Sequence, residues 1–141
     1  MQNCALEKKF DATLPHVNII QQEVRRVVIN IINNAFYAVQ DKYELLKSEN
    51  SLQEYTPSVS VFTERKNGSA IIKISDNGAG IPAEMKDKIF NPFFTSKPTG
   101  KGTGLGLSVS YDIVTKTHQG TIRFESEKNI GSTFFVELPI N

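Results

Sequence analysis

Apolar residues recur at every third or fourth position along the longest periodic stretch of the chain, which starts at Gln21. This spacing places them on one face of an α-helix, so it predicts an amphipathic helix of at least about five turns. The residues that keep the spacing are Val24, Val27, Val28, Ile31, Ile32, Ala35, Ala38 and Val39.

Alternating apolar and polar positions in the second half of the chain predict two β-hairpins. Asn67-Gly68 separates the two runs of the first hairpin, and both residues tolerate the positive φ that such a turn requires. The turn of the second hairpin is expected at residues 129–131. The four strands are expected at residues 58–63 and 70–75, and at residues 121–126 and 133–138.

The remaining segments predict shorter elements. Residues 5–10 and 17–20 have the pattern of short strands, whereas the polar residues 48–57 predict a loop. Residues 83–90 and about 105–117 are expected to form two further helices. Antiparallel hairpins beneath helices give an α+β fold, a sandwich of two layers with the helices on one face of the sheet.

The composition is ordinary for a soluble globular protein of 141 residues, and we expect one domain that spans residues 1–141. Sixteen Lys and Arg residues against fifteen Asp and Glu give a net charge of +1, which argues against nucleic acid or a membrane surface as a partner. Cys4 is the single cysteine, which excludes a disulfide framework and fits a reducing cytoplasm. No apolar run approaches the roughly 20 residues that a membrane-spanning helix needs.

Two asparagines, Asn30 and Asn34, lie one helical turn apart at the margin of the apolar stripe, with Tyr37 beside them. Their amide oxygens could bind one ligand together. A neutral oxygen suits Mg²⁺ when phosphates supply the charge, because this ion keeps most of its water and takes only one or two protein ligands. Taken alone, the pair also fits two solvated asparagines on a helix surface.

The sequence SDNGAGIP, residues 75–82, directly follows a predicted strand. Its glycines satisfy the spacing of a dinucleotide-binding loop, but that interpretation fails because the strand belongs to a hairpin and a basic segment lies about 20 residues on. Asp76 instead predicts a carboxylate that accepts a hydrogen bond from the exocyclic amine of adenine, while Gly78 and Gly80 leave room for the flat ring. An ordinary Asp-Asn-Gly turn is the alternative.

A glycine-rich stretch leads into the last predicted helix. It lacks the P-loop pattern, because neither Lys97 nor Lys101 is followed by Ser or Thr. Such a turn directs free N–H groups outward at the positive end of a helix, which stabilises an anion by roughly 1–2 kcal/mol. We therefore expect a phosphate site, within reach of both lysines, rather than a plain flexible loop. The glycines are Gly100, Gly102, Gly104 and Gly106.

Two histidines and one threonine complete the candidates. His16 and His118 have no spaced metal-ligand partner and no Ser or Cys in a triad-like setting, so surface or capping roles are expected for both. Thr133 opens the last predicted strand, where threonine is common for its β-propensity alone.

Taken in order, these motifs resemble the four sequence boxes of the ATP-binding catalytic domain of sensor histidine kinases, which belong to the GHKL superfamily with its Bergerat fold. NIINNAFYAV resembles the N box, DNGAGI the G1 box, FNPFFTSK the F box and GTGLGLS the G2 box. The resemblance covers the chain from roughly residue 6 to Pro139. It implies a mixed, mostly antiparallel sheet covered on one face by helices, and an ATP lid formed by residues from about 82 to 103.

The resemblance also implies roles for individual residues. Asn34 holds Mg²⁺, Asn30 supports the phosphates, and Asp76 binds the adenine amine, with Thr133 helping through a water molecule. Lys97 meets the phosphates and is, with Asn30, an expected catalytic residue. The other residues expected to bind ATP are Tyr37, Gly78, Gly80, Ile81, Phe90, Gly102, Thr103, Gly104, Leu105, Gly106 and Leu107. Many relatives have a basic residue where this chain has Tyr37.

One position separates the branches of the superfamily. ATPases of the gyrase type carry a glutamate four residues before the metal-binding asparagine as general base, whereas this chain has Asn30, which cannot accept a proton. The resemblance therefore implies a histidine protein kinase domain that binds Mg·ATP and transfers the γ-phosphoryl group. The alternatives are an ATP-driven conformational switch, as in MutL or Hsp90, and a degenerate module that only binds nucleotide.

The phosphoacceptor histidine is expected outside this chain. In the family it lies on a two-helix dimerisation hairpin, and neither His16 nor His118 has that setting. The expected partners are the histidine-containing dimerisation domain of the same kinase and, downstream, a response regulator. The expected location is the cytoplasm, which includes the cytosolic end of a membrane-bound sensor.

Overall fold

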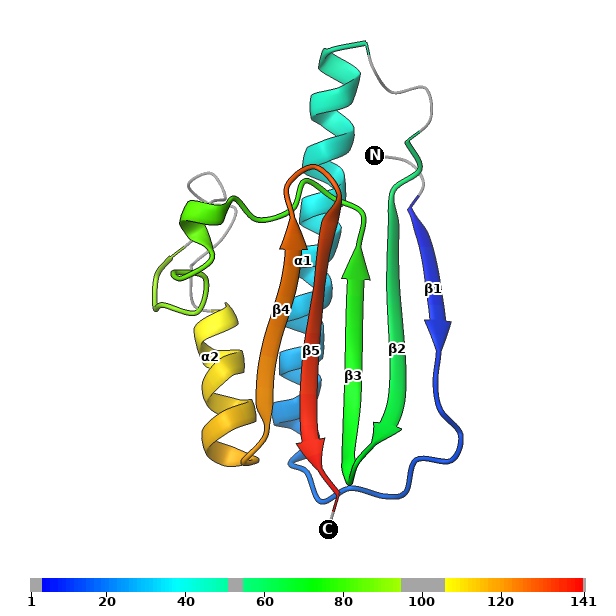
Figure 1. Ribbon diagram of the computed structural model, residues 1–141, viewed down its shortest axis with the longest axis vertical. Helices are drawn as coiled ribbons and strands as arrows, with labels where there is room; N and C mark the ends of the chain where they lie inside the picture. The colour runs from blue at the N-terminus through cyan, green and yellow to red at the C-terminus, as the bar shows by residue number, and fades with distance from the viewer. Residues whose placement is uncertain (1–3, 51–54, 95–105, 141) are drawn as a thin grey trace.

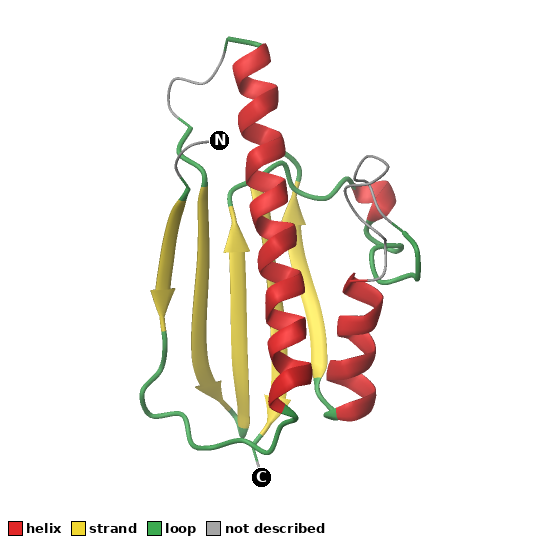
Figure 2. Cartoon of the chain, turned by 180° about the vertical axis from the view of Figure 1, so that it is seen from behind, coloured by secondary structure: helices red, strands yellow, loops and turns green. Residues whose placement is uncertain are grey.

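The computed structural model describes residues 4–50, 55–94 and 106–140. Five strands form one sheet in the order β1-β2-β3-β5-β4, and the helices lie together on one of its faces (Figure 1, Figure 2). This arrangement confirms the predicted α+β sandwich. The strands are β1 (Ala5–Lys9), β2 (Ser58–Lys66), β3 (Ser69–Asp76), β4 (Thr121–Glu127) and β5 (Gly131–Pro139).

The sheet is mixed and mostly antiparallel, as the resemblance implied. β1 pairs parallel to β2 at one edge, and all other neighbouring strands pair antiparallel. Asn67 and Gly68 have φ values of 51° and 80°, so the first predicted hairpin, β2–β3, has the turn that its sequence predicts. The second hairpin, β4–β5, turns through Asn129 and Gly131, which also have positive φ.

The long helix α1 (Gln21–Ser48) is the one that the apolar spacing predicts, and it lies along the sheet as the main cover of its core (Figure 2). Burial of its apolar stripe against the strands accounts for its stability, since each fully buried Val or Ile contributes about 1.5–3 kcal/mol. The stripe consists of Val24, Val27, Ile31, Ala35 and Val39, which join Val59, Ile74 and Val136 of the sheet in one core.

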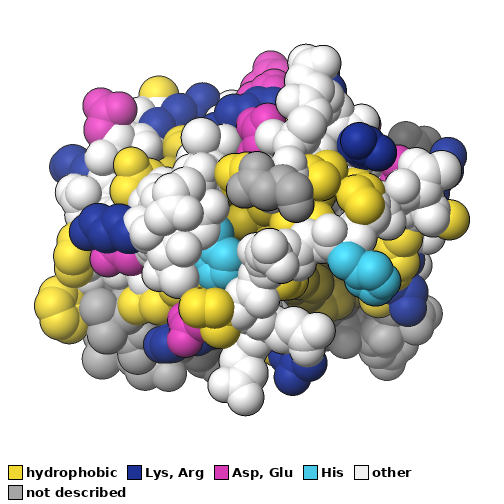
Figure 3. Space-filling model, turned by 90° about the horizontal axis from the view of Figure 1, so that it is seen from below, with side chains coloured by type: hydrophobic (Ala, Val, Ile, Leu, Met, Phe, Trp, Pro, Cys, Tyr) yellow, Lys and Arg dark blue, Asp and Glu magenta, His cyan; other side chains and the backbone are white. Residues whose placement is uncertain are grey.

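The second helix, α2 (Gly106–Asp112), continues as a π-helical turn, η2 (Ile113–Thr117), and packs beside α1. His118 follows this turn. Its Nε2 accepts the N–H of Ile20, the N-cap residue of α1, at 3.0 Å, so Nδ1 carries the proton and donates to the Ile113 carbonyl at 2.9 Å. The capping role expected for a histidine is confirmed for His118. Histidine side chains reach the surface at this end of the molecule (Figure 3).

The predicted strand at residues 17–20 is wrong. Ile20 already acts as the N-cap residue of α1, and the neighbouring Ile19 packs onto the hydrophobic core. The apolar residues of this segment therefore begin the helix and close the end of the core instead of pairing with a strand.

The predicted helix at residues 83–90 is also wrong, because only one 3₁₀ turn forms, η1 (Ala83–Met85), followed by further turns. Two contacts with the rest of the fold override the helical pattern. Ile89 is buried in the core, and Lys86 Nζ donates a hydrogen bond to the Ser126 carbonyl at 2.8 Å.

Within the described part of the chain, no helix is long and apolar enough to cross a membrane.

Candidate functional site

Asp76 ends β3 on the face of the sheet that the helices cover, two residues after the core residue Ile74. Its Oδ1 accepts the Gly78 N–H at 2.8 Å. Burial raises the pKa of Asp76 to about 6, an effect that backbone hydrogen bonds from Gly78 and Ser132 and the charge of Lys42 partly offset. A half-buried carboxylate whose pKa stays raised is suited to accept a hydrogen bond from a ligand.

The loop after Asp76 is wedged between α1 and the β4–β5 hairpin, and two glycines make this possible. A Cβ atom at Gly78 would lie 2.6–2.8 Å from the backbone and side chain of Ala38 in α1. Gly80 has a φ of 76°, and a Cβ there would collide with the carbonyl oxygen of Glu127. The two glycines are therefore required by close packing of the loop, in addition to any room they leave for a ligand.

Asn77, which the sequence analysis did not single out, fixes the start of the same loop. Its Oδ1 accepts the Ser58 N–H at 2.8 Å, and its Nδ2 donates to the Thr56 carbonyl at 2.8 Å. The Tyr55 hydroxyl lies 3.1 Å from the Asn77 carbonyl oxygen. The Asp-Asn-Gly sequence signals a turn here, but the partners of Asn77 lie about 20 positions away and follow only from the fold.

Asn30 connects α1 to the start of α2. Its Nδ2 lies 3.2 Å from the Gly106 carbonyl oxygen and 3.4 Å from Ser110 Oγ, and it donates to both. Ser110 is completely buried and donates to the same Gly106 carbonyl at 2.7 Å. The N box and the G2 box are thus joined, and Asn34 lies half-buried one turn further along α1.

Thr133 and Asp76, which the sequence analysis assigned to one task, lie on opposite faces of the sheet. Thr133 Oγ1 is 2.9 Å from Ser75 Oγ across the β3–β5 pair, on the face opposite to the described helices. Ser132 is the residue paired with Asp76, and it is 6% exposed. Its hydroxyl lies 2.8 Å from Ser126 Oγ. The hydroxyl beside Asp76 therefore belongs to Ser132 and not to Thr133.

The other predicted ATP-binding residues are only partly described. Ile81 donates its N–H to Ser126 Oγ at 2.7 Å, and Leu107 packs against the core. The Phe90 ring contacts Tyr111 and Phe124, with centroids 5.3 and 5.9 Å apart. Outside the described residues lie Lys97, Gly102, Thr103, Gly104 and Leu105, together with part of the expected lid.

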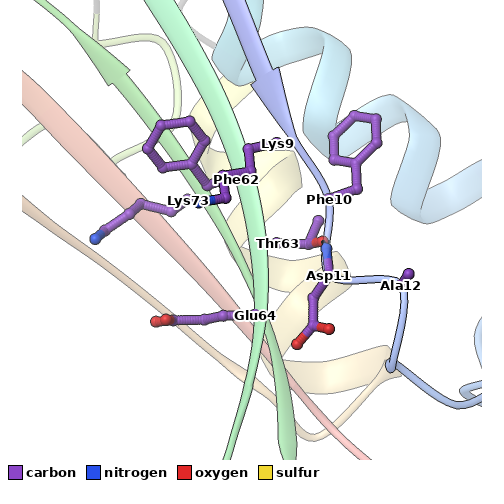
Figure 4. Close-up of a pocket in the computed structure, with 8 residues that line it drawn as sticks. All are labelled: Lys9, Phe10, Asp11, Ala12, Phe62, Thr63, Glu64 and Lys73. Carbon is purple, nitrogen blue, oxygen red and sulfur yellow. Dashed lines mark hydrogen bonds between the residues drawn. The ribbon is translucent and has the colours of Figure 1, made fainter.

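A pocket of about 480 Å³ lies elsewhere, at the end of β1 (Figure 4). Phe62 and Lys73, which line it, pair with each other in β2 and β3 three positions away from the Val59–Asp76 pair. Val59 and Val61 of β2 point to the core face, the face of Asp76, which pairs with Val59. Phe62 directly follows Val61 in the strand, so its side chain points to the opposite face. This pocket is therefore separate from the Asp76 site.

The donor chemistry fits one kind of metal site. Over residues 4–50, 55–94 and 106–140, no three His, Cys, Asp or Glu side chains gather into a metal-binding cluster. The candidate ligands on α1, Asn30 and Asn34, are neutral amides. They fit Mg²⁺ that phosphates also bind, and they do not fit a cation held by protein carboxylates alone.

The sequence matches a known family. Residues 19–141 match the family described as histidine kinase-, DNA gyrase B- and HSP90-like ATPases. Signal transduction histidine-protein kinase AtoS of Escherichia coli (strain K12) is 36% identical over 133 residues, which are 94% of this chain and 19% of AtoS. Sporulation kinase C of Bacillus subtilis (strain 168) is 33% identical over 141 residues, 99% of this chain and 29% of that kinase. The chain spans less than a third of these relatives.

Solved structures agree with this match. The catalytic domain of histidine kinase ThkA superposes with a TM-score of 0.76 at 28% identity, covering 97% of this chain and 80% of that one. The mycobacterial sensor histidine kinase MprB superposes with a TM-score of 0.72 at 26% identity, covering 96% and 83%. The chain therefore belongs to the family of histidine kinase-, DNA gyrase B- and HSP90-like ATPases, as an ATP-binding catalytic domain of the sensor histidine kinase type.

Proposed function

We propose that this chain binds Mg·ATP and donates the γ-phosphoryl group to a histidine of a dimerisation domain in two-component signalling. The observation that carries the proposal is the half-buried Asp76 carboxylate at the end of β3, on the face of the sheet that α1 covers, with a raised pKa and a closely packed loop after it. It supplies the one group needed to select adenine, and it lies on the same face of the sheet as the helix with Asn30 and Asn34.

Adenine recognition follows from the chemistry of Asp76. Its carboxylate accepts a hydrogen bond from the exocyclic amine of adenine, whereas guanine places a carbonyl oxygen at that position. A charge-assisted hydrogen bond contributes roughly 1.5–3 kcal/mol, and a buried carboxylate left unpaired costs at least as much. Ser132, paired with Asp76, takes the water-mediated contact that the sequence analysis assigned to Thr133.

Phosphate binding rests on α1 and on the segment that leads into α2. Asn30 holds the Gly106 carbonyl at 3.2 Å and so orients the start of α2, while Lys97 and residues 102–107 are the proposed phosphate contacts. Asn34 is the proposed protein ligand of Mg²⁺, which when bound neutralises charge on the phosphate oxygens. Because Asn30 cannot take a proton from water, transfer to an acceptor is favoured over hydrolysis.

Transfer is tested with γ-labelled ATP. We expect slow hydrolysis by the chain alone, and an acid-labile phosphohistidine when the histidine-bearing dimerisation domain of the same kinase is added. The same domain with its acceptor histidine changed to Gln serves as the control and is expected to stay unlabelled. Rapid turnover without the acceptor domain would favour an ATP-driven switch, and binding without transfer would favour a degenerate nucleotide-binding module.

Metal binding is tested with Asn34→Ala. We expect this change to remove the Mg²⁺ dependence of ATP binding, because it deletes the proposed amide ligand. The neighbouring Asn33 is exposed on the same helix, so Asn33→Ala is the matched control and is expected to keep the dependence. The measurement is calorimetric titration of ATP with and without Mg²⁺, and an unaltered metal titration for Asn34→Ala contradicts the assignment.

The proposed partners are the histidine-containing dimerisation domain of the same kinase and a response regulator, and the proposed location is the cytoplasm, where ATP is available. The names of the relatives, which are sensor and signal-transduction kinases, support the proposed partners.

A further inference from the structure

Lys42 links α1 to the far side of the Asp76 loop. It lies one helical turn beyond Ala38, the residue against which Gly78 packs. Its Nζ donates to the Asn129 carbonyl in the β4–β5 turn at 2.7 Å, and the Asn129 N–H donates to the Ala79 carbonyl at 2.7 Å. Lys42 therefore reaches the second half of the loop through a single intervening residue.

Tyr55 holds the first half of the same loop. Its hydroxyl lies 3.1 Å from the Asn77 carbonyl oxygen and 3.3 Å from Asn77 Oδ1. Burial, and secondly the negative charge of Asp76, raise the pKa of Tyr55 to about 12, so the hydroxyl keeps its proton and donates. The Lys42 ammonium lies 4.9 Å from the centroid of the Tyr55 ring, a cation–π contact that joins the two side chains.

The surroundings of Asp76 include both side chains, together with the backbone N–H groups of Gly78 and Ser132, which lower its pKa more than Lys42 does. Lys42, from α1, is the charged side chain that lowers the pKa of Asp76, against the larger effect of burial. Tyr55, from the segment before β2, is a titratable neighbour whose own pKa is raised by the Asp76 charge and, to a smaller extent, by Cys4. From β5 the carboxylate receives a backbone hydrogen bond of Ser132. Loss of Lys42 therefore removes positive charge from the site, whereas loss of the Tyr55 hydroxyl does not change its charge.

We propose that Lys42 and Tyr55 are positioning residues for nucleotide recognition, which clamp residues 76–80 between α1 and the β4–β5 turn and set a positive charge near the carboxylate that meets adenine. The inference rests on the proposed function. Its physical consequence is a loop that is ordered before the nucleotide arrives, which lowers the cost of binding. It also gives a role to Lys42 and Tyr55, which both lie outside the four sequence boxes.

The test measures ATP dissociation constants between pH 5 and pH 9 for matched variants. For the wild type we expect affinity to fall as the pH is lowered through about 6, where Asp76 becomes protonated. Lys42→Met is expected to weaken binding about threefold to tenfold at pH 7 and to move the acidic limb of the profile to higher pH. Lys42→Arg is expected to restore the position of that limb.

Tyr55→Phe tests the contact between Tyr55 and the loop separately from the charge of Lys42. It removes only the hydroxyl, so we expect about a threefold to tenfold loss of affinity with the acidic limb left near its wild-type position. The controls are Lys47→Met in the last turn of α1 and Tyr43→Phe, both expected to bind ATP like the wild type.

The outcomes are distinguishable. If the wild type fails to bind ATP in preference to GTP, the proposed function fails and this inference fails with it. If the wild type binds selectively but Lys42→Met and Tyr55→Phe titrate like their controls, the clamp alone is overturned. Thermal unfolding identifies a variant that does not fold, and if Lys42→Met is such a variant, Tyr55→Phe against Tyr43→Phe decides the question.

Discussion

Asp76→Asn is expected to weaken ATP binding by at least about tenfold, because an amide replaces the charged acceptor of the adenine amine and a charge-assisted hydrogen bond contributes roughly 1.5–3 kcal/mol. The amide can also donate to the carbonyl oxygen of guanine, so the preference for ATP over GTP is expected to fall further than the affinity itself. Calorimetric titration of both nucleotides measures the two effects. Unchanged ATP affinity would sink the assignment of Asp76 to adenine.

The same substitution is expected to stabilise the nucleotide-free fold at high pH. The pKa of Asp76 is raised from 3.8 to about 6 in the folded chain, so the ionised form destabilises the fold. This cost is fully present above pH 6 and disappears as the pH falls toward 3.8. The difference between the two pKa values corresponds to at most about 3 kcal/mol in the free energy of unfolding.

Denaturant unfolding at pH 8 and pH 4 tests the effect on stability. We expect Asp76→Asn to unfold at higher denaturant than the wild type at pH 8, and the difference to shrink at pH 4. Asp87→Asn is the matched control, because Asp87 is exposed, and it is expected to leave stability unchanged at both values. An equal shift for Asp76→Asn at pH 8 and pH 4 would contradict the raised pKa of the Asp76 carboxylate.

Gly80→Ala is expected to destabilise the fold by about 2–5 kcal/mol, against about 1–2 kcal/mol for Gly68→Ala. Both glycines have a left-handed backbone, with φ of 76° and 80°, so an L-residue is strained at either position. Only at Gly80 does the added Cβ also collide with a carbonyl, that of Glu127, whereas Gly68 has open space around it. The difference between the variants isolates the packing of the loop against the β4–β5 hairpin.

The glycine pair also separates stability from binding. Gly80→Ala moves the loop that carries Asp76, so its ATP affinity is expected to fall, while Gly68→Ala alters the distant β2–β3 turn and is expected to bind normally. Urea unfolding and ATP titration of both variants give the comparison. Equal destabilisation by the two substitutions would show that the loop is not wedged as described.

Local signals in the sequence were sufficient for the main elements. The apolar spacing of α1 and the Asn67-Gly68 turn act over a few residues, and both predictions are confirmed. Residues 17–20 and 83–90 were predicted wrongly because their conformation depends on distant partners. The Ile20 N–H is bound by His118, and Lys86 is bound to the Ser126 carbonyl. Such contacts join segments that no local pattern relates.

The candidate site divides in the same way. Asp76 and its glycines could be predicted, because a carboxylate at a strand end followed by Gly-x-Gly is a local signal. The sequence could also have distinguished Ser132 from Thr133. Strict alternation back from the core residue Phe134 places Ser132 on the core face of the sheet and Thr133 on the opposite face. The clamp formed by Lys42 and Tyr55 could not be predicted, because Lys42, Tyr55 and Asn129 come together only in the folded chain.

The most direct test of the central claim is titration of the chain with ATP and with GTP in the presence of Mg²⁺, while nucleotide turnover is followed in the same sample. We predict binding that is selective for ATP, with negligible hydrolysis in the absence of an acceptor domain. Equal binding of the two nucleotides, no binding of either, or brisk hydrolysis by the chain alone would contradict it.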